Sequence, residues 1–162
     1  MIITAIDPGT DESGIVMWTP SGKPILAEKA KNEWIKSVVG MYTRPERVFV
    51  IEEINPYTMG KTIRDTILWS GRFQEAIESR GGEVVYLSRN QIRQALCGSA
   101  GPRINDTAIK QALVDRFAYG QKNFGKGTKK EPGFFYGFSK DIWQAFALAV
   151  AYAKINGFLN DK

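Results

Sequence analysis

The chain has 162 residues and a formal net charge of +5, and it contains one cysteine and no histidine. Without histidine it can form no Ser-His-Asp or Cys-His nucleophile and no His-ligated zinc, haem or iron site, and a single cysteine excludes an intramolecular disulfide. If the chain is an enzyme, its chemistry must come from carboxylates, Lys or Arg, Tyr, Ser or Thr, or a metal ion held by carboxylates.

The first part of the sequence predicts three strands, a helix, a fourth strand and a long helix. Short apolar runs that end in turn residues are typical of strands, and a run that is apolar at every position is typical of a central strand covered on both faces. Strands are predicted at 2–6, 14–18, 25–30 and 48–51, and helices at 32–42 and 60–80. The run at 48–51 is the one that predicts a central strand.

The second part predicts one more strand and three helices. They are a strand at 83–87, a short helix at 89–96, a helix capped by Asn105 or Asp106, and a last helix capped by Ser139. Residues 119–137 are rich in Gly, Lys and aromatics and are predicted to form a mobile basic loop. This order of strands and helices predicts a single α/β domain over residues 1–162, with a five-stranded mixed sheet flanked by helices.

The charge is unevenly distributed along the chain. Residues 89–130 hold nine basic and two acidic side chains, a local charge of +7, so the remainder carries 5 − 7 = −2. Such a segment is typical of a polyanion binder, but a solvated surface that serves solubility explains it equally well. The longest run without Asp, Glu, Lys or Arg has 12 residues, too short to span a bilayer, and the N-terminus does not resemble a signal peptide. We therefore expect a cytoplasmic protein without a membrane partner.

Four acidic residues lie at ends of the predicted elements. Asp7 follows the first strand, Glu52 and Glu53 follow the fourth, and Asp141 lies in the first turn of the last helix. If the first and fourth strands are parallel neighbours, Asp7 meets only one of the two glutamates, because adjacent strand residues point to opposite faces. Crowded carboxylates suit Mg²⁺, and two such ions can hydrolyse a phosphodiester without histidine. Taken singly, each acid also has a structural interpretation, in a turn, at a helix dipole or at a solvated strand end.

Five segments, in order, resemble the RuvC-type Holliday junction resolvases, particularly the phage-encoded branch, within the ribonuclease H-like superfamily. They are IDPGT at 6–10, VIEE at 50–53, QIRQALCG at 91–98, RINDTAIKQALVDRF at 103–117 and SKDIWQAFALAVAYA at 139–153. The resemblance implies a ribonuclease H-like fold and a metal-dependent endonuclease that resolves four-way and related branched double-stranded DNA by paired hydrolysis. It selects Asp7, Glu52 and Asp141 as catalytic residues and as ligands of Mg²⁺, for which Mn²⁺ can substitute.

The same resemblance implies a homodimer, because paired nicks need two active sites, and it points to the helix at 60–80 as the dimer face. That helix is equally suited to an intramolecular core. A phage-infected or prophage-bearing bacterial cytoplasm is the implied setting.

The last motif departs from the family, which often has a second acid three residues after the first. Gln144 stands at that position, one helical turn from Asp141. The weaker candidates for the missing metal ligand are Glu53, Asp106 and Gln144 itself, and Asp106 is favoured as a helix N-cap instead.

Contacts with DNA are predicted from exposed basic and aromatic residues. Tyr57 or Met59 is expected to stack on or wedge between bases, although Tyr57 is equally well explained as a packed loop residue. Phosphate contacts are assigned to Lys61, Arg64, Arg93, Arg103, Lys126, Lys129 and Lys130. Two other functions stay open: a ribonuclease H-like nuclease acting on RNA–DNA hybrids or flaps, and a junction-binding module without catalysis.

Overall fold

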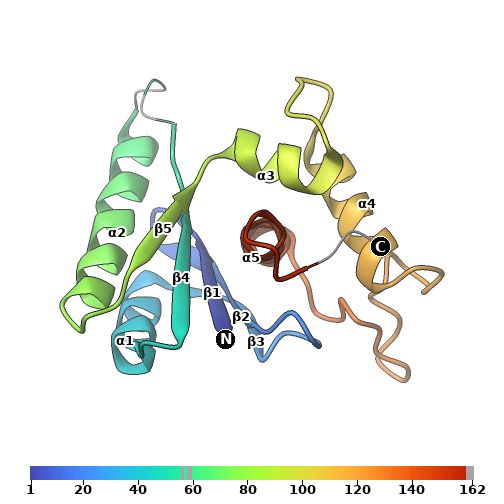
Figure 1. The fold of residues 1–162 in the computed structure, drawn as a ribbon, viewed down its shortest axis with the longest axis horizontal. Coiled ribbons are helices and arrows are strands. Elements are labelled where there is room, and N and C mark those ends of the chain that lie inside the picture. Colours follow the sequence, from blue (N-terminus) through green and yellow to red (C-terminus); the bar gives the residue numbers. More distant parts are fainter. Residues whose placement is uncertain (56, 58–59, 160–162) are drawn as a thin grey trace.

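The computed structural model describes residues 1–55, 57 and 60–159 (Figure 1). The strands are β1 (Ile2–Asp7), β2 (Glu12–Trp18), β3 (Leu26–Lys31), β4 (Arg47–Glu52) and β5 (Val84–Leu87). The helices are α1 (Asn32–Tyr42), α2 (Lys61–Glu78), α3 (Arg89–Cys97), α4 (Asp106–Phe117) and α5 (Lys140–Ile155). All ten predicted elements are present, and their ends differ from the predicted ones by at most two residues.

The strands form one mixed sheet in the order β3-β2-β1-β4-β5. β1 pairs in parallel with β4 and β4 in parallel with β5, whereas β2 is antiparallel to both β1 and β3. The α/β class and the five-stranded mixed sheet are therefore confirmed. Because β1 and β4 are parallel neighbours, their carboxyl ends meet at the same edge of the sheet.

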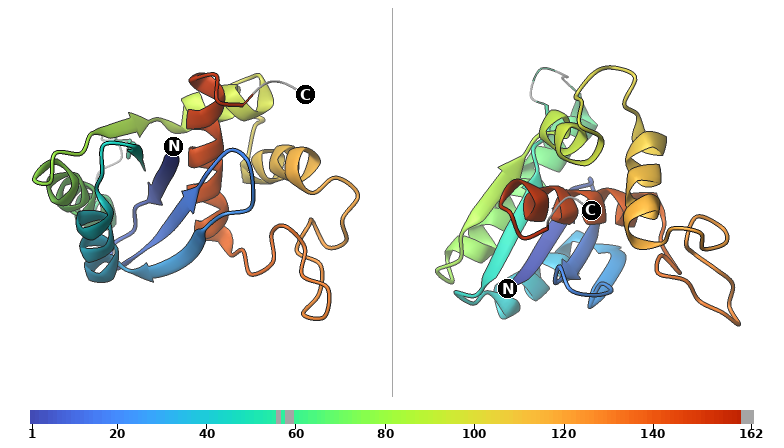
Figure 2. Two further views of the ribbon diagram at one scale, coloured as in Figure 1. Left: turned by 60° about the horizontal axis from the view of Figure 1, so that its bottom comes forward. Right: turned by 45° about the vertical axis from the view of Figure 1, so that its right-hand side comes forward.

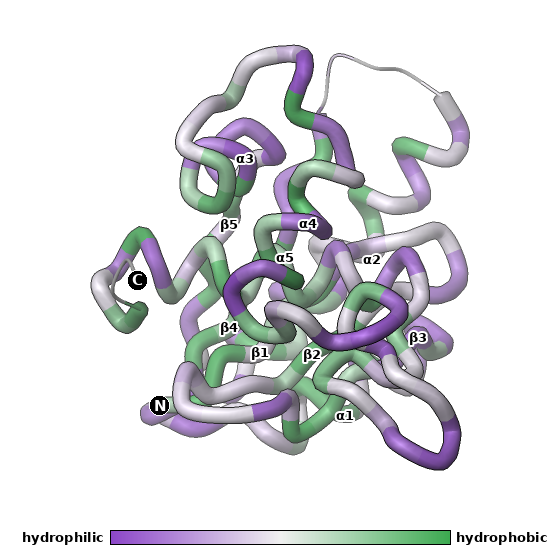
Figure 3. Tube along the Cα trace, turned by 90° about the vertical axis from the view of Figure 1, so that its right-hand side faces the viewer, coloured by the Kyte–Doolittle hydropathy of each residue, from purple (hydrophilic) through white to green (hydrophobic). Residues whose placement is uncertain are grey.

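Helices cover both faces of the sheet. Helices α1 and α2 lie on one face and α5 on the other, with α3 and α4 packed outside α5 (Figures 1 and 2). The β4 run confirms the prediction of a central strand, since Val50 packs toward α5 while Phe49 and Ile51 pack toward α1 and α2. Hydrophobic residues lie along β1, β2, β4 and α5, whereas hydrophilic residues dominate the outer loops (Figure 3).

The N-terminal caps of α4 and α5 were both predicted, and the structure adds a detail to each. The side chain of Asn105 caps α4 by accepting a hydrogen bond from the Ala108 N–H at 3.0 Å, so Asp106 is not the cap. Ser139 occupies the N-cap position of α5, but its side chain makes no capping hydrogen bond.

The predicted loop at 119–137 contains no helix or strand. It is attached to the core near its end, where Phe135 is fully buried and its N–H donates to the Gly125 carbonyl at 2.8 Å. For the segment between Gly125 and Phe135, mobility stays a prediction. Among the described helices, none combines the length and the apolar character that crossing a membrane requires.

Candidate active site

Asp7 and Glu52 come together at the carboxyl ends of β1 and β4. Ile6 lies beside Ile51 in the parallel register, so the next residues of the two strands are also neighbours. Alternate residues of each strand point to the same face, and Ala5 and Val50 both pack toward α5. Asp7 and Glu52 therefore face α5 together, and their side chains share a hydrogen bond.

Glu53 points away from this pair, as strand parity requires. Its side chain is exposed, and its backbone N–H donates to the Leu87 carbonyl at 2.9 Å. The structure thus places Glu52 and not Glu53 beside Asp7, a choice that the uniformly apolar run before them left open.

Burial and neighbouring charges act on both carboxyl groups. Burial, with the neighbouring charges of Glu52 and Asp141, raises the pKa of Asp7 to about 8. Burial likewise raises the pKa of Glu52, while the nearby Arg89 charge opposes the increase. At neutral pH the pair therefore holds a proton unless a cation replaces it.

The turn after Asp7 is fixed by a closed ring of hydrogen bonds. The Gly9 N–H donates to Ser13 Oγ at 2.9 Å, the Ser13 hydroxyl donates to Asn32 Oδ1 at 2.6 Å, and Asn32 Nδ2 donates to the Gly9 carbonyl at 3.0 Å. Ser13 and Asn32 are almost completely buried. This ring joins β1, β2 and α1, and it holds the chain that leaves the site in one conformation.

Asp141 reaches the same edge from the first turn of α5. Its carboxylate forms an ion pair with Lys29 of β3, with 2.8 Å between Oδ2 and Nζ. The hydrogen bond with Asp141 raises the pKa of Lys29. Lys29 lies beside Gly14, which in turn lies beside Asp7, so the three residues form a row across the sheet.

Arg89 links the acidic residues on the other side of the site. Its Nη1 lies 3.5 Å from Glu52 Oε1 and donates a hydrogen bond to Gln144 Oε1, and its Nη2 pairs with Asp106 Oδ1. The prediction that Asp106 serves as a helix cap was wrong, because that carboxylate faces Arg89. Both Asp106 and Gln144 are thus brought to the site, but as partners of Arg89.

Sequence reasoning missed the roles of Arg89, Lys29 and Gly14. Arg89 begins α3, two residues after the end of β5. Because β5 is the neighbour of β4, the predicted order of the strands contained a signal for it. No sequence pattern marks Lys29 or Gly14, since their positions depend on the register of three strands.

The donor chemistry of the site fits a hard divalent cation. Asp7 and Glu52 offer adjacent carboxylate oxygens, the ligand type that Mg²⁺ prefers, and a cation between them would remove the need for a shared proton. Within the described residues, no three acidic or cysteine side chains are gathered closely enough to hold an ion by themselves. Lys29 and Arg89 instead engage the carboxylates of Asp141 and Asp106.

The predicted DNA contacts on and before α2 are exposed. Tyr57 has 91% of its surface accessible, so packing does not explain this residue, and Met59 lies outside the described residues. Lys61 and Arg64 are also exposed, and Lys61 pairs with Asp65 at 2.6 Å.

The other predicted contacts lie on α3 and on the loops around α4. Arg93 is half-buried, and its Nε has no hydrogen-bond partner among the described residues. Arg103, Lys129 and Lys130 are exposed, whereas Lys126 is half-buried in a cavity beside Gln144.

The sheet order, the helices on both faces and the carboxylates at the ends of β1 and β4 define a ribonuclease H-like fold. Among solved structures, the chain is similar to RuvC of Thermus thermophilus, with a TM-score of 0.72 and 19% identity over 98% of this chain and 96% of that chain. The same values hold for T. thermophilus RuvC in complex with a Holliday junction substrate. No family model and no curated protein sequence matches the chain. The likeness therefore establishes the fold, and the functional argument depends on the site.

Proposed function

We propose that the chain is a divalent-cation-dependent DNA endonuclease that resolves four-way junctions and related branched DNA. The observation that carries the proposal is the contact between Asp7 and Glu52 at adjoining ends of two parallel strands, with the Asp141 charge close enough to raise the pKa of Asp7. The fold is shared with a protein solved on a Holliday junction, which favours branched DNA as the substrate.

The chain's own residues have distinct roles in this proposal. Asp7 and Glu52 would hold the cation, and Asp141 would join them as a third ligand by exchanging its Lys29 partner for the ion. Arg89 orients Glu52. Mg²⁺, or Mn²⁺ in its place, would supply an activated water and the charge that stabilises the leaving oxygen, in the two-ion form of this chemistry. Gln144 takes the place of a second acid on α5 and is held by Arg89, so it contributes a neutral oxygen at most.

We assign substrate recognition to the shape of the DNA and to the charge of its phosphate backbone. Exposed Lys61, Arg64 and Arg103, together with the basic loop, would contact phosphates, while the exposed Tyr57 would stack on bases at the branch point. A phage-encoded origin and a bacterial cytoplasm belong to the same proposal.

Paired cutting requires two active sites, so we further propose a homodimer. Thr66, Ser70, Phe73 and Ile77 of α2 face the core, but Ile67 and Leu68 are 42% and 60% exposed on the outer surface of that helix. An exposed aliphatic pair on a long outer helix is a suitable contact for a second copy.

The deciding experiment incubates an end-labelled four-way junction with the wild-type chain, with Asp7→Asn and with Glu53→Gln, in Mg²⁺, Mn²⁺ or EDTA. Glu53→Gln is the matched control, because Glu53 adjoins Glu52 but points away from Asp7. We expect paired symmetric nicks from wild type and Glu53→Gln with either ion, and binding without cutting from Asp7→Asn. Faster cutting of an RNA–DNA hybrid or a flap would favour another ribonuclease H-like nuclease, and binding without cutting by the wild type would favour a junction-binding module.

A further inference from the structure

A cavity of about 290 Å³ opens beside the carboxylate site, between the first turns of α4 and α5 and the basic loop. Asp106 and Gln144 form the wall toward the site, and both contact Arg89, which lies 3.5 Å from Glu52. The Arg89 side chain therefore links the wall of the cavity to Glu52.

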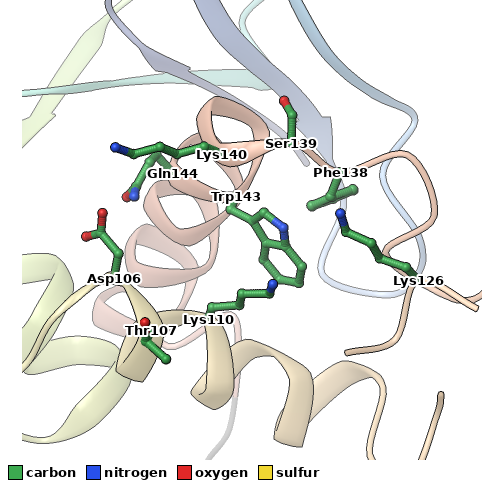
Figure 4. A pocket seen from close by; sticks show the side chains of 9 residues that line it. All are labelled: Asp106, Thr107, Lys110, Lys126, Phe138, Ser139, Lys140, Trp143 and Gln144. Carbon is green, nitrogen blue, oxygen red and sulfur yellow. The ribbon is translucent and has the colours of Figure 1, made fainter. Parts of the chain in front are cut away.

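Three lysines from three separate segments line this cavity. Lys110 comes from α4, Lys126 from the loop and Lys140 from the start of α5 (Figure 4). None of the three forms an ion pair with a described residue, and the one acidic group in the lining, Asp106, is paired with Arg89. The ammonium groups of Lys110 and Lys126 lie near the Trp143 ring, and that of Lys140 lies on the Gln144 side (Figure 4). Three ammonium groups without carboxylate partners around one cavity favour an anion in it.

The remaining lining combines hydroxyl groups with an aromatic wall. Thr107 and Ser139 contribute hydroxyls, and the Ser139 side chain is not used to cap α5. The Trp143 ring lies between the lysines, with Phe138 beside it (Figure 4). Lys110 Nζ lies 5.0 Å from the centre of the Trp143 ring and 4.5 Å from the centre of the Phe124 ring, so cation–π contacts hold this ammonium in place before any ligand binds.

We infer that this cavity binds one unstacked nucleotide of the DNA strand that lies in the carboxylate site, an inference that rests on the proposed function. Lys110 and Lys126 would contact its phosphate, and the accessible edges of Trp143 and Phe138 would contact its base or sugar. The volume lies near the lower end of small-ligand pockets, about 300 Å³, which suits one nucleotide and excludes a duplex. A branch point already interrupts stacking, so moving a base out of the helix costs less there than inside a duplex.

The test uses the full chain and four-way junctions that carry 2-aminopurine at a single position, moved nucleotide by nucleotide across the branch point. Titrations in EDTA follow the emission of the base, so no cutting is needed. For the wild type we expect a change in emission at one position. Lys110→Gln removes one charge-assisted contact, so this variant should lose about tenfold in affinity and should also lose the emission change. Lys110→Arg keeps the charge and should retain both.

The matched control is Lys122→Gln, which removes an exposed lysine of the basic loop that does not line this cavity. It should keep the position-specific emission change. Should Lys110→Gln unfold in a thermal melt, Lys126→Gln tests the same cavity from the loop. The inference is overturned if no position changes its emission, or if Lys110→Gln keeps the change.

Failure of this inference and failure of the proposed function give different results. A chain that cuts junctions in Mg²⁺ but shows no position-specific emission retains the endonuclease and loses the nucleotide pocket. A chain that shows the emission change but does not cut retains the pocket and loses the endonuclease.

Discussion

A Cβ atom on Gly14 would lie 2.3 Å from the backbone oxygen of Asp141, so the last helix approaches the sheet here only because residue 14 has no side chain. Gly14 of β2 lies beside Asp7 of β1 and faces α5. The glycine thus sets the distance between the helix that carries Asp141 and the strand that carries Asp7, although it has no chemical group of its own.

We expect Gly14→Ala to reduce cutting far more than it reduces junction binding. The methyl group must push the start of α5 outward, and a displacement of the order of 1 Å at a reacting centre costs about a hundredfold in rate. Overpacking of this kind destabilises a protein by about 1–3 kcal/mol, which urea unfolding measures. Gly22→Ala is the control, because a Cβ at residue 22 meets no atom within 4 Å. Unchanged cutting by Gly14→Ala would show that the position of Asp141 does not limit the reaction.

Arg89→Ala should shift the pH profile of cutting upward. The Arg89 charge lowers the pKa of both Glu52 and Asp7, so its removal raises the pH at which these groups lose their proton and become able to hold a cation. We expect a loss of about tenfold at neutral pH, since a change of one pKa unit alters the deprotonated fraction by that factor. The rate of cutting in Mg²⁺, measured from pH 6 to about pH 9, checks this.

Arg89→Lys separates charge from geometry in the same experiment. An ammonium keeps the positive charge but cannot contact Glu52, Gln144 and Asp106 together as the guanidinium fork does. The lysine variant should therefore retain the pH profile more closely than Arg89→Ala while losing part of its maximal rate. An unshifted profile in Arg89→Ala would contradict the electrostatic role.

Metal-free stability should fall as pH rises through the range where Asp7 titrates. An ordinary aspartate has a pKa of 3.8, whereas the pKa of Asp7 is about 8 in the folded chain. Between these values the folded state keeps a proton that the unfolded state has lost, so the free energy of unfolding decreases with pH, by at most about 1.4 kcal/mol per pH unit for this group. Below pH 3.8 both states are protonated at Asp7, and its contribution no longer varies.

Asp7→Asn removes this titration and serves as the reference. In EDTA at pH 8 the variant should melt at a higher temperature than wild type, and the gap should close toward pH 4. Mg²⁺ should stabilise wild type more than the variant, because the ion relieves the repulsion between Asp7 and Glu52. A gap that does not change with pH would mean that Asp7 is not the buried carboxyl group inferred here.

Leu68→Glu should convert the proposed dimer into monomers. The Leu68 side chain is 60% exposed on the outer surface of α2, so the substitution leaves the core intact but places a charge in the proposed contact. Light scattering measures the mass, and the label pattern on a junction distinguishes paired from single nicks. Ile25→Glu is the control, because Ile25 is 63% exposed but lies just before β3, at the opposite edge of the sheet from β5, the strand that α2 contacts. If the Leu68→Glu variant still forms dimers, the interface lies elsewhere on the molecule.

The sequence by itself determined the elements and the type of chemistry. The run Val48–Ile51 is apolar at every position, and such a strand is stable only when both of its faces are covered, so it predicted the centre of the sheet. The absence of histidine and the acids at the ends of predicted elements limited the candidate chemistry to carboxylates and a cation. These properties follow from local pattern and composition, which folding does not change.

Only the tertiary structure decided which groups meet. The register of β1 against β4 chose Glu52 over Glu53, and the approach of α5 to Gly14 brought Asp141 to Asp7. Arg89 joined Glu52, Asp106 and Gln144 although they are distant in sequence, and it took Asp106 away from the capping role that its position suggested. These contacts depend on strand register and helix packing, and a shift of one residue in register would turn each strand side chain to the opposite face of the sheet.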